Sequence, residues 1–299
     1  MIRVDNVAVI GAGIMGNGIA QVAAQAGCSV FLMDLNEPLL EKGFASIRKS
    51  LGIMQTKGKI TEQQKAEVLS RISGTTDFKR AVSQADLVIE VVPENLDLKK
   101  QVFKDLDKTC PKHAILATNT SGLSITAIGA ATARPDKVLG MHFANPVPVM
   151  KAVELIRGLD TSDETLAMAI EFVKKVGKEH EVAKDFPGFA GSRMIAAFIN
   201  EAFWILYEGI SSAEDIDKHA RNQFRHPMGP LELADFTGVD TMLSVIENLH
   251  KELGDRFRPC PLMKQLVAAG YHGRKSGRGV YKYAESSQFT TKGTGNGEK

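Results

Sequence analysis

The chain has 299 residues, more than one hydrophobic core usually supports, and this length favours two domains over one. Hydrophobic residues make up 43% and charged residues 24%, which is ordinary for a soluble globular protein. The formal net charge of +2 excludes nucleic acid as the main partner, because a phosphate-binding surface normally carries a strong basic excess.

The cysteines and the apolar runs indicate the cellular compartment of the protein. Cys28, Cys110 and Cys260 are far apart and lack Cys-x-x-Cys spacing, so we expect neither a metal site nor a disulfide framework. Residues 7–10 form an apolar run that is too short for a signal peptide, and no run is long enough to span a bilayer. We therefore expect a soluble cytoplasmic protein with no membrane partner.

The first half of the chain alternates strand-like runs with helical stretches, which predicts a parallel sheet covered by helices. Strands are predicted at residues 4–10, 29–34, 86–92, 114–118, 137–143, 152–156 and 179–183. Between the second and third of these, helices at 39–54 and 62–70 form an inserted hairpin, and Thr61 with Gln64 makes a capping box for its second helix. The predicted fold class is α/β, with a doubly wound Rossmann-type sheet and an inserted helical hairpin in residues 1–186.

The character of the chain changes after residue 186, where proline and glycine interrupt it and helical periodicity takes over. One broad apolar face is predicted from Met194, Ile195, Phe198, Ile199, Ala202, Phe203 and Leu206. Ser212 with Asp215 resembles a helix start, and residues 238–253 form another amphipathic stretch. We predict an all-α domain over residues 187–285 and a disordered tail over 286–299.

A glycine-rich loop follows the first predicted strand and opens a helix. The run Gly11-Ala12-Gly13-Ile14-Met15-Gly16 has the spacing of a dinucleotide-binding loop, in which a helix N-terminus faces the phosphates. Asp34 ends the second strand, where a carboxylate can bind ribose hydroxyls, and no arginine follows it to hold a 2′-phosphate. NAD is therefore favoured over NADP. FAD is the competing cofactor, but we find no second flavin-type segment.

A histidine and a glutamate lie on neighbouring predicted strands. His142 ends one strand, Glu154 lies on the next, and the turn at residues 146–148 would fold the two strands side by side. Ligands of doubly wound sheets bind at the carboxyl ends of strands, and an imidazole oriented by a carboxylate can take the proton of a hydroxyl group. The alternative is a structural histidine near a surface glutamate, and the pattern alone does not decide between them.

The surrounding sequence resembles the 3-hydroxyacyl-CoA dehydrogenase family, most closely its short, single-function form. The resemblance covers nearly the whole chain. Its motifs are the glycine loop, Glu94-Asn95, Asn119-Thr120-Ser121, Met141-His142-Phe143-Ala144-Asn145-Pro146, Ala152-Val153-Glu154, Pro187-Gly188-Phe189 and His226-Pro227-Met228-Gly229-Pro230. It implies NAD-dependent oxidation of an (S)-3-hydroxyacyl-CoA to a 3-oxoacyl-CoA, and the reverse. It also implies a helical C-terminal domain that contributes to a substrate cleft and to a homodimer.

The resemblance also implies a role for individual residues. His142 matches the catalytic base, Glu154 its partner, and Ser121 a serine that contacts the substrate near its hydroxyl group. The residues matched to the cofactor pocket are Gly11, Gly13, Ile14, Met15, Gly16, Asp34, Glu94, Lys99, Asn119 and Asn145. Two alternatives stay open, namely that Lys99 is a solvated residue of a charged helix face and that Ser121 is a helix cap.

Two positions depart from the family pattern. Ser192 occupies the place of an asparagine that contributes to the catalytic site, and Ala144 replaces the second phenylalanine of the His-Phe-Phe-Asn-Pro form. A serine hydroxyl is shorter than a carboxamide and has fewer donors. Our hypothesis is that the two smaller residues admit a longer, branched or cyclic acyl chain. The alternative is that Ser192 only lowers the rate.

Two rival functions remain open at this point. A β-hydroxyacid dehydrogenase acting on a free acid would use a lysine base, for which Lys184 is the candidate. A nucleotide-sensing protein would keep the NAD site without turnover. The CoA phosphates need cationic partners, for which the hairpin offers Arg48, Lys49, Lys57 and Lys59, although a solvated basic face explains any one of them equally well.

Overall fold

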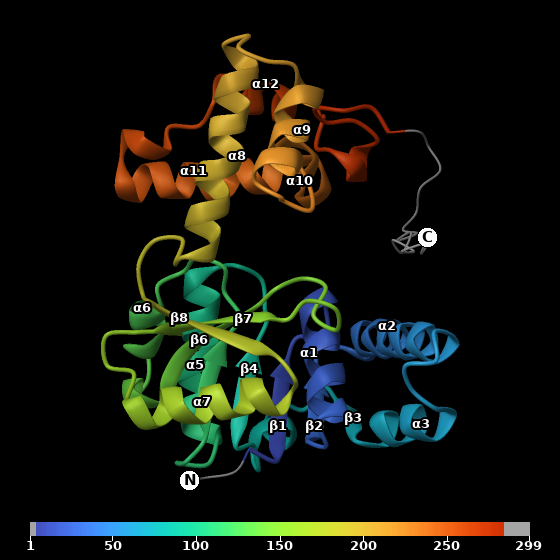
Figure 1. The fold of residues 1–299 in the computed structure, drawn as a ribbon. Coiled ribbons are helices and arrows are strands. Elements are labelled where there is room, and N and C mark those ends of the chain that lie inside the picture. Colours follow the sequence, from blue (N-terminus) through green and yellow to red (C-terminus); the bar gives the residue numbers. More distant parts are fainter. Residues whose placement is uncertain (1–3, 284–299) are drawn as a thin grey trace. The chain divides into compact units, whose positions relative to one another are not determined.

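A computed structural model describes residues 4–283, which form two compact units that divide between Ala190 and Gly191 (Figure 1). The predicted domain boundary after residue 186 falls a few residues earlier, in the loop that precedes the division. The tail predicted for residues 286–299 lies outside the described residues.

The first unit is built on one sheet of eight strands in the order β3-β2-β1-β4-β5-β6-β7-β8. The strands are β1 (Asn6–Ile10), β2 (Ser29–Met33), β3 (Ile72–Thr75), β4 (Leu87–Glu90), β5 (Ile115–Thr118), β6 (Val138–Phe143), β7 (Ala152–Arg157) and β8 (Glu179–Lys184). All neighbours pair in parallel except β6 and β7, which are antiparallel. The first six strands have the doubly wound order, so the predicted fold class is confirmed.

Helices cover both faces of this sheet because its strands are apolar on both sides. Along β1, Val7 and Val9 pack into one core, and Ala8 and Ile10 into the other. The first core is closed by α1 (Ile14–Gln25), α2 (Glu37–Thr56), α3 (Glu62–Ser70) and α7 (Asp163–Lys175). The second is closed by α4 (Phe78–Val82), α5 (Leu96–Thr109) and α6 (Ile125–Gly129), and a short 3₁₀ helix, η1 (Pro135–Lys137), precedes β6.

The inserted hairpin consists of α2 and α3. Its capping box is confirmed, since Thr61 Oγ1 accepts from the Gln64 N–H (3.1 Å) and Gln64 Oε1 accepts from the Thr61 N–H (2.8 Å). The prediction that the next strand after the hairpin is β4 was wrong, because β3 and α4 come between them. Strand β3 has only four residues, and its central pair, Ser73 and Gly74, is exposed, so it shows neither an apolar run nor alternation.

The second unit is helical. It contains α8 (Gly191–Tyr207), α9 (Ala213–Gln223), α10 (Pro230–Thr237), α11 (Val239–Leu253), α12 (Pro261–Ala268) and the 3₁₀ helices η2 (Asp255–Phe257) and η3 (Arg274–Ser276). Ile199, Ala202 and Phe203 of α8 are buried as predicted, but Met194 is 72% exposed and does not belong to that face. Ser212 caps α9 by accepting from the Asp215 N–H (3.2 Å). Over residues 4–283, no helix combines the length and apolar character required to cross a membrane.

Candidate active site

The glycine loop joins β1 to α1 at the carboxyl edge of the sheet. Gly11 has φ +111°, which favours glycine, and a Cβ on Gly16 would lie 1.8 Å from the Gly11 carbonyl oxygen. These two glycines therefore shape the loop itself. A Cβ on Gly13 would instead meet nothing within 4 Å.

The first turn of α1 offers room for an anion. Gly13 is the N-cap and contributes no side-chain cap, while the helix begins at Ile14, whose side chain is 77% exposed. The first N–H groups of a helix lack intrahelical acceptors and lie at its positive end. Met15 packs against the core instead. The open space beside Gly13 and the free amides next to it fit the pyrophosphate of a dinucleotide.

Asp34 lies directly after β2 and is tied to the glycine loop. Its Oδ2 accepts from the Ala12 N–H (2.7 Å), and its Oδ1 accepts from the Leu35 N–H (2.7 Å). Each carboxylate oxygen has a second lone pair, so both can still accept from a ribose hydroxyl. Asp34 thus holds the end of β2 against the glycine loop.

The ends of β5 and β6 carry a second group of predicted residues. Asn119 Oδ1 accepts from the Phe143 N–H (2.8 Å), which fixes the end of β5 against the residue next to His142. Glu94 Oε1 accepts from the Ser121 N–H (3.0 Å) and from the Thr120 hydroxyl group. Ser121 is exposed, and the cap of α6 is Ser124, so the helix-cap alternative for Ser121 is wrong.

Lys99 lies beneath this group and not at its surface. Its side chain is 1% exposed, and its Nζ is 2.8 Å from Glu90 Oε1 and 3.5 Å from Glu94 Oε2. The alternative of a solvated helix residue is therefore wrong. Burial raises the pKa of Glu90, while the charge and hydrogen bond of Lys99 act in the opposite direction.

His142 and Glu154 are direct partners in the antiparallel pairing of β6 with β7. The imidazole Nδ1 is 3.4 Å from Glu154 Oε2, and the exposed side-chain fractions are 23% for His142 and 7% for Glu154. Glu154 Oε1 accepts from the Ala190 N–H (2.8 Å), which restrains the carboxylate from its other side. The predicted pair is thus brought together, with the imidazole still open to solvent.

Asn145, Ala144 and Ser192 have different surroundings. Ala144 is half-buried and Asn145 is exposed, and both follow His142 in the loop between β6 and β7. Ser192 belongs to the first turn of α8 in the helical unit.

Lys184, the base that a free-acid dehydrogenase would need, is far from His142 along the sheet. Lys184 pairs with Arg157, and Arg157 pairs with Leu139 near the start of β6, whereas His142 is near its end. Because β7 and β8 run antiparallel to β1–β6, the end of β8 lies at the opposite edge of the sheet. Within residues 4–283, no cluster of three or more His, Cys, Asp or Glu side chains is arranged to hold a metal ion.

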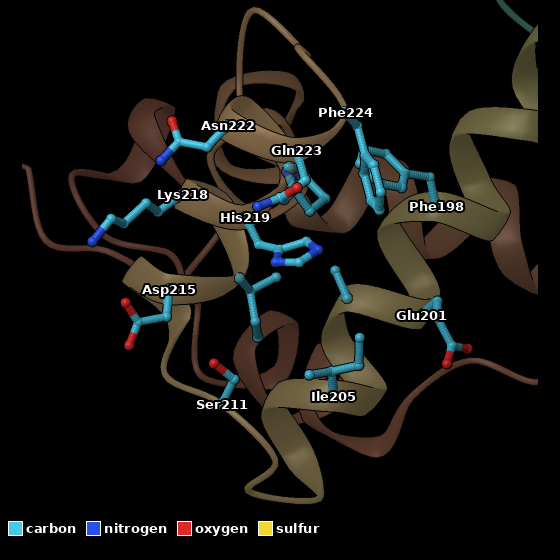
Figure 2. A pocket seen from close by; sticks show the side chains of 14 residues that line it. Phe198, Glu201, Ile205, Ser211, Asp215, Lys218, His219, Asn222, Gln223 and Phe224 are labelled. Carbon is cyan, nitrogen blue, oxygen red and sulfur yellow. The ribbon is translucent and has the colours of Figure 1, made fainter.

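The helical unit contains a pocket of about 630 Å³ between α8 and α9 (Figure 2). Phe198, Ile205 and Phe224 contribute apolar walls, and His219 points toward its centre. Phe224 is 59% exposed, so the walls of this pocket present apolar surface to solvent. None of the predicted site residues lines it.

Sequence reasoning missed Glu90 and Thr118, which form the floor of the strand-end group. Thr118 Oγ1 donates to Glu90 Oε2 (2.8 Å), and both side chains are fully buried. The available signal was an acid at the end of the apolar strand Leu87–Glu90, since a buried carboxylate needs partners.

Comparison with known proteins connects this geometry to one family. Residues 6–186 match the model of the 3-hydroxyacyl-CoA dehydrogenase NAD binding domain, and residues 188–283 match that of the C-terminal domain of the same enzymes. The chain is 49% identical over 286 residues to a probable 3-hydroxybutyryl-CoA dehydrogenase of Bacillus subtilis, covering 95% of this chain and 99% of the relative. It is 45% identical over 290 residues to the 3-hydroxybutyryl-CoA dehydrogenase of Bradyrhizobium diazoefficiens, covering 97% and 99%.

The fold is similar to solved structures of such enzymes. The crystal structure of (S)-3-hydroxybutyryl-CoA dehydrogenase from Ralstonia eutropha matches with a TM-score of 0.91 and 47% identity, covering 94% of this chain and all of that one. The 3-hydroxybutyryl-CoA dehydrogenase from Escherichia coli matches with a TM-score of 0.92 and 39% identity, covering 96% of this chain and 61% of that one.

Proposed function

The chain belongs to the 3-hydroxyacyl-CoA dehydrogenase family, and from this premise we propose that His142 is its general base and Glu154 the residue that orients it. The reaction is the NAD-dependent oxidation of a 3-hydroxyacyl-CoA to a 3-oxoacyl-CoA, and its reverse. The observation that carries the catalytic assignment is the 3.4 Å approach of Glu154 Oε2 to His142 Nδ1 across the β6–β7 pair.

His142 and Glu154 have different roles in the proton transfer. With its Nδ1 proton directed at Glu154, neutral His142 presents the lone pair of Nε2 and removes the proton of the 3-hydroxyl group. The imidazolium that forms is stabilised by the adjacent carboxylate. Glu154 keeps its orientation because Ala190 donates to its other oxygen. In the reverse direction the imidazolium returns the proton to the oxygen atom at C3.

NAD, when bound, supplies the acceptor for the hydride that leaves C3. The first unit would hold it through the loop Gly11–Gly16, with the pyrophosphate at the α1 N-terminus and the ribose hydroxyls at Asp34. Glu94, Asn119 and Asn145 would complete the pocket at the carboxyl edge of the sheet. The space beside Gly13 supports this assignment.

The substrate is an acyl-CoA thioester, and we propose the (S) enantiomer of its 3-hydroxy form. Ser121 would contact the substrate near its hydroxyl group, and Ser192 would contribute from the first turn of α8. Ser121 is exposed while its backbone N–H is held by Glu94, which suits a side chain that contacts a ligand. The free-acid reaction is less well supported, because its candidate base Lys184 pairs with Arg157 of β7, and Arg157 pairs with Leu139 near the start of β6, away from His142.

The absorbance of NADH, followed with acetoacetyl-CoA and separately with free acetoacetate, tests this function. Our proposal predicts NADH consumption with the thioester and little with the free acid. Preference for the free acid would support the β-hydroxyacid dehydrogenase. Tight NADH binding without consumption of either compound would support a sensor.

We also propose that the partner is a second copy of the chain, bound through the helical unit. In that unit Tyr207, Ile210 and Phe224 are 49%, 68% and 59% exposed, and Phe224 lines the pocket between α8 and α9. Large apolar side chains exposed in this way favour burial against a protein surface. A symmetric dimer would cover them, because a two-fold axis applies the same patch to both copies.

A cytoplasmic location is proposed as well. Cys28, Cys110 and Cys260 are buried and unpaired. Burial raises the pKa of the Cys110 thiol to about 12, against the smaller effect of Arg134, so this sulfur stays protonated. Buried free thiols of this kind suit a reducing compartment.

A further inference from the structure

A lysine outside the proposed catalytic group holds the loop between β6 and β7. Lys178 directly precedes β8, and its Nζ donates to two carbonyl oxygens of that loop, those of Val147 (2.6 Å) and Met150 (2.6 Å). The loop consists of residues 144–151 and contains Asn145. One ammonium group thus joins the loop to the start of the edge strand.

The loop is folded into a compact turn. The N–H groups of Val149 and Met150 both donate to the Pro146 carbonyl oxygen (3.0 and 2.9 Å). Val147 is 1% exposed and Val149 is 74% exposed, so the turn buries one valine side chain and presents the other to solvent. Asn145 immediately precedes the proline whose carbonyl oxygen closes the turn, so a displacement of the turn moves Asn145 as well.

The same turn packs against α1. Gly18 of this helix is buried, and a Cβ there would lie 2.8 Å from Val147 Cβ and 3.3 Å from Pro148 Cδ. Both distances are shorter than the contact distance of about 3.5–4.0 Å between nonbonded carbon atoms. The loop is therefore held by two independent supports, the close packing on α1 and the hydrogen bonds from Lys178.

The charge of Lys178 is met by these carbonyl oxygens. Burial lowers the pKa of Lys178, and no carboxylate of residues 4–283 forms an ion pair with it. Taking a charged group partly out of water is unfavourable unless hydrogen bonds compensate, and here the acceptors are the two loop carbonyls. The presence of a lysine at this place is therefore explained by its hold on the loop.

We propose that Lys178 is a positioning residue of the dehydrogenase, which fixes the β6–β7 loop and thereby places Asn145 at the cofactor pocket, beside the strand end that carries His142. The kinetic consequences rest on the proposed function, whereas the effect on the loop rests on the hydrogen bonds alone. In this role Lys178 needs no contact with the cofactor or the substrate.

Four variants probe the two supports of the loop. Lys178→Met keeps the apolar stem and removes the donors, while Lys178→Arg keeps a charge and several donors and should restore the wild-type behaviour. Gly18→Ala displaces Val147 from the side of α1. Lys174→Met is the matched control, because Lys174 is an exposed lysine of α7 that pairs with Glu171 at the surface.

Hydrogen exchange in the protein without cofactor or substrate separates positioning from direct contact with a ligand. We expect Lys178→Met and Gly18→Ala to accelerate exchange of the Val149 and Met150 N–H groups by about tenfold or more, as loss of a charge-assisted hydrogen bond implies. Lys178→Arg and Lys174→Met should exchange at wild-type rates. A lysine that contacts only a ligand would leave all four variants at the wild-type rate in the free protein.

Kinetics with NADH and acetoacetyl-CoA test the connection to Asn145. We expect kcat/KM to fall by about tenfold to a hundredfold in Lys178→Met, the scale of a small misplacement of a binding group, and to recover in Lys178→Arg. The double variant Asn145→Ala/Lys178→Met should be little worse than Asn145→Ala alone, because both changes act through one residue.

Wild-type exchange rates of the loop in Lys178→Met would overturn the proposal. Effects of Lys178→Met and Asn145→Ala on kcat/KM that add in full would overturn it as well, since Lys178 would then act independently of Asn145. Should Lys178→Met not fold, the same two criteria apply to Lys178→Gln, whose side chain is shorter. Failure of the wild-type protein to reduce acetoacetyl-CoA would count against the proposed function instead, and the exchange rates would still decide whether Lys178 holds the loop.

Discussion

Glu154 faces His142 across the β6–β7 ladder, with its Oε2 at 3.4 Å from the imidazole Nδ1. Directly opposed residues of antiparallel strands have their side chains on the same face, so the register of the sheet alone brings the two groups together. The side chain of Glu154 is 7% exposed and that of His142 is 23% exposed, so the carboxylate is shielded from water while the imidazole is accessible to a substrate. A restrained imidazole of this kind needs little reorganisation to accept a proton.

Two glycine substitutions separate cofactor binding from folding. Gly13→Ala places a methyl group in open space, so the melting temperature should stay unchanged, while the NADH Kd rises by at least about tenfold, or about 1.4 kcal/mol. Gly16→Ala would put its Cβ 1.8 Å from the Gly11 carbonyl oxygen and should lower the melting temperature as well. Thermal melts and NADH fluorescence check both variants. Unchanged NADH affinity in Gly13→Ala would contradict the placement of the pyrophosphate.

The acyl specificity is expected to extend beyond four carbons, because the side chain of Ala144 is smaller than the phenylalanine of the family pattern. Steady-state kinetics over a series of 3-oxoacyl-CoA substrates test this, and Ala144→Phe should shift the preference toward the short chain. A clear four-carbon optimum in the wild-type protein would defeat the idea. Ser192→Asn is the companion variant, since a gain in turnover at every chain length would assign the effect to rate and not to specificity.

Much of this molecule could be predicted from local patterns. The glycine loop, the capping box at Thr61 and the strands beside His142 and Glu154 each follow from residues close together in sequence. Strand β3 could not, because four residues with an exposed Ser73 and Gly74 carry no periodic signal.

The burial and the ion pairing of Lys99 were harder to predict from the sequence, because its acidic partners come from other segments. Its neighbours Asp97 and Lys100 suggest a charged helix surface, yet Lys99 shares the buried face of α5 with Phe103 and Leu106. Helical spacing from those two residues indicated burial. That its charge is met by Glu90 and Glu94 follows only from the packing of α5 against β4, which tertiary structure decides.

Dimer formation through the helical unit is expected to depend on Phe224. A charged residue there, as in Phe224→Glu, would be buried without a partner in the dimer, so the variant should elute as a monomer. Size-exclusion chromatography with light scattering gives the mass, and Glu201→Gln, at the same pocket, controls for a change of charge alone. A wild-type protein that is monomeric at micromolar concentration would contradict the proposed partner.

The stability of the first unit should depend on pH through Asp107. Burial alone would raise the pKa of this carboxyl, but hydrogen bonds from the Ala133 N–H and Arg134, together with the charge of Arg134, lower it. A carboxyl whose pKa is lower in the folded state contributes stability above its unfolded pKa of about 3.9 and loses that contribution as the pH falls through the folded value.

Asp107→Asn should therefore lower the free energy of unfolding at pH 7 by about 2 kcal/mol, and the difference from wild type should shrink below about pH 4. Urea denaturation of both proteins at a series of pH values gives this difference. A gap that stays constant down to about pH 3 would show that the charge of Asp107 is not its source.

The most direct test of the central claim is hydride transfer in His142→Gln, measured in single turnovers with saturating NADH and acetoacetyl-CoA. Loss of the acid–base group should slow the step by about 10² to 10⁴-fold, while the NADH Kd stays at its wild-type value because no cofactor-binding residue has changed. Glu154→Gln should reduce the same rate by a smaller factor. Hydride transfer in His142→Gln at close to the wild-type rate would contradict the account, since the proton would then have to move through another group.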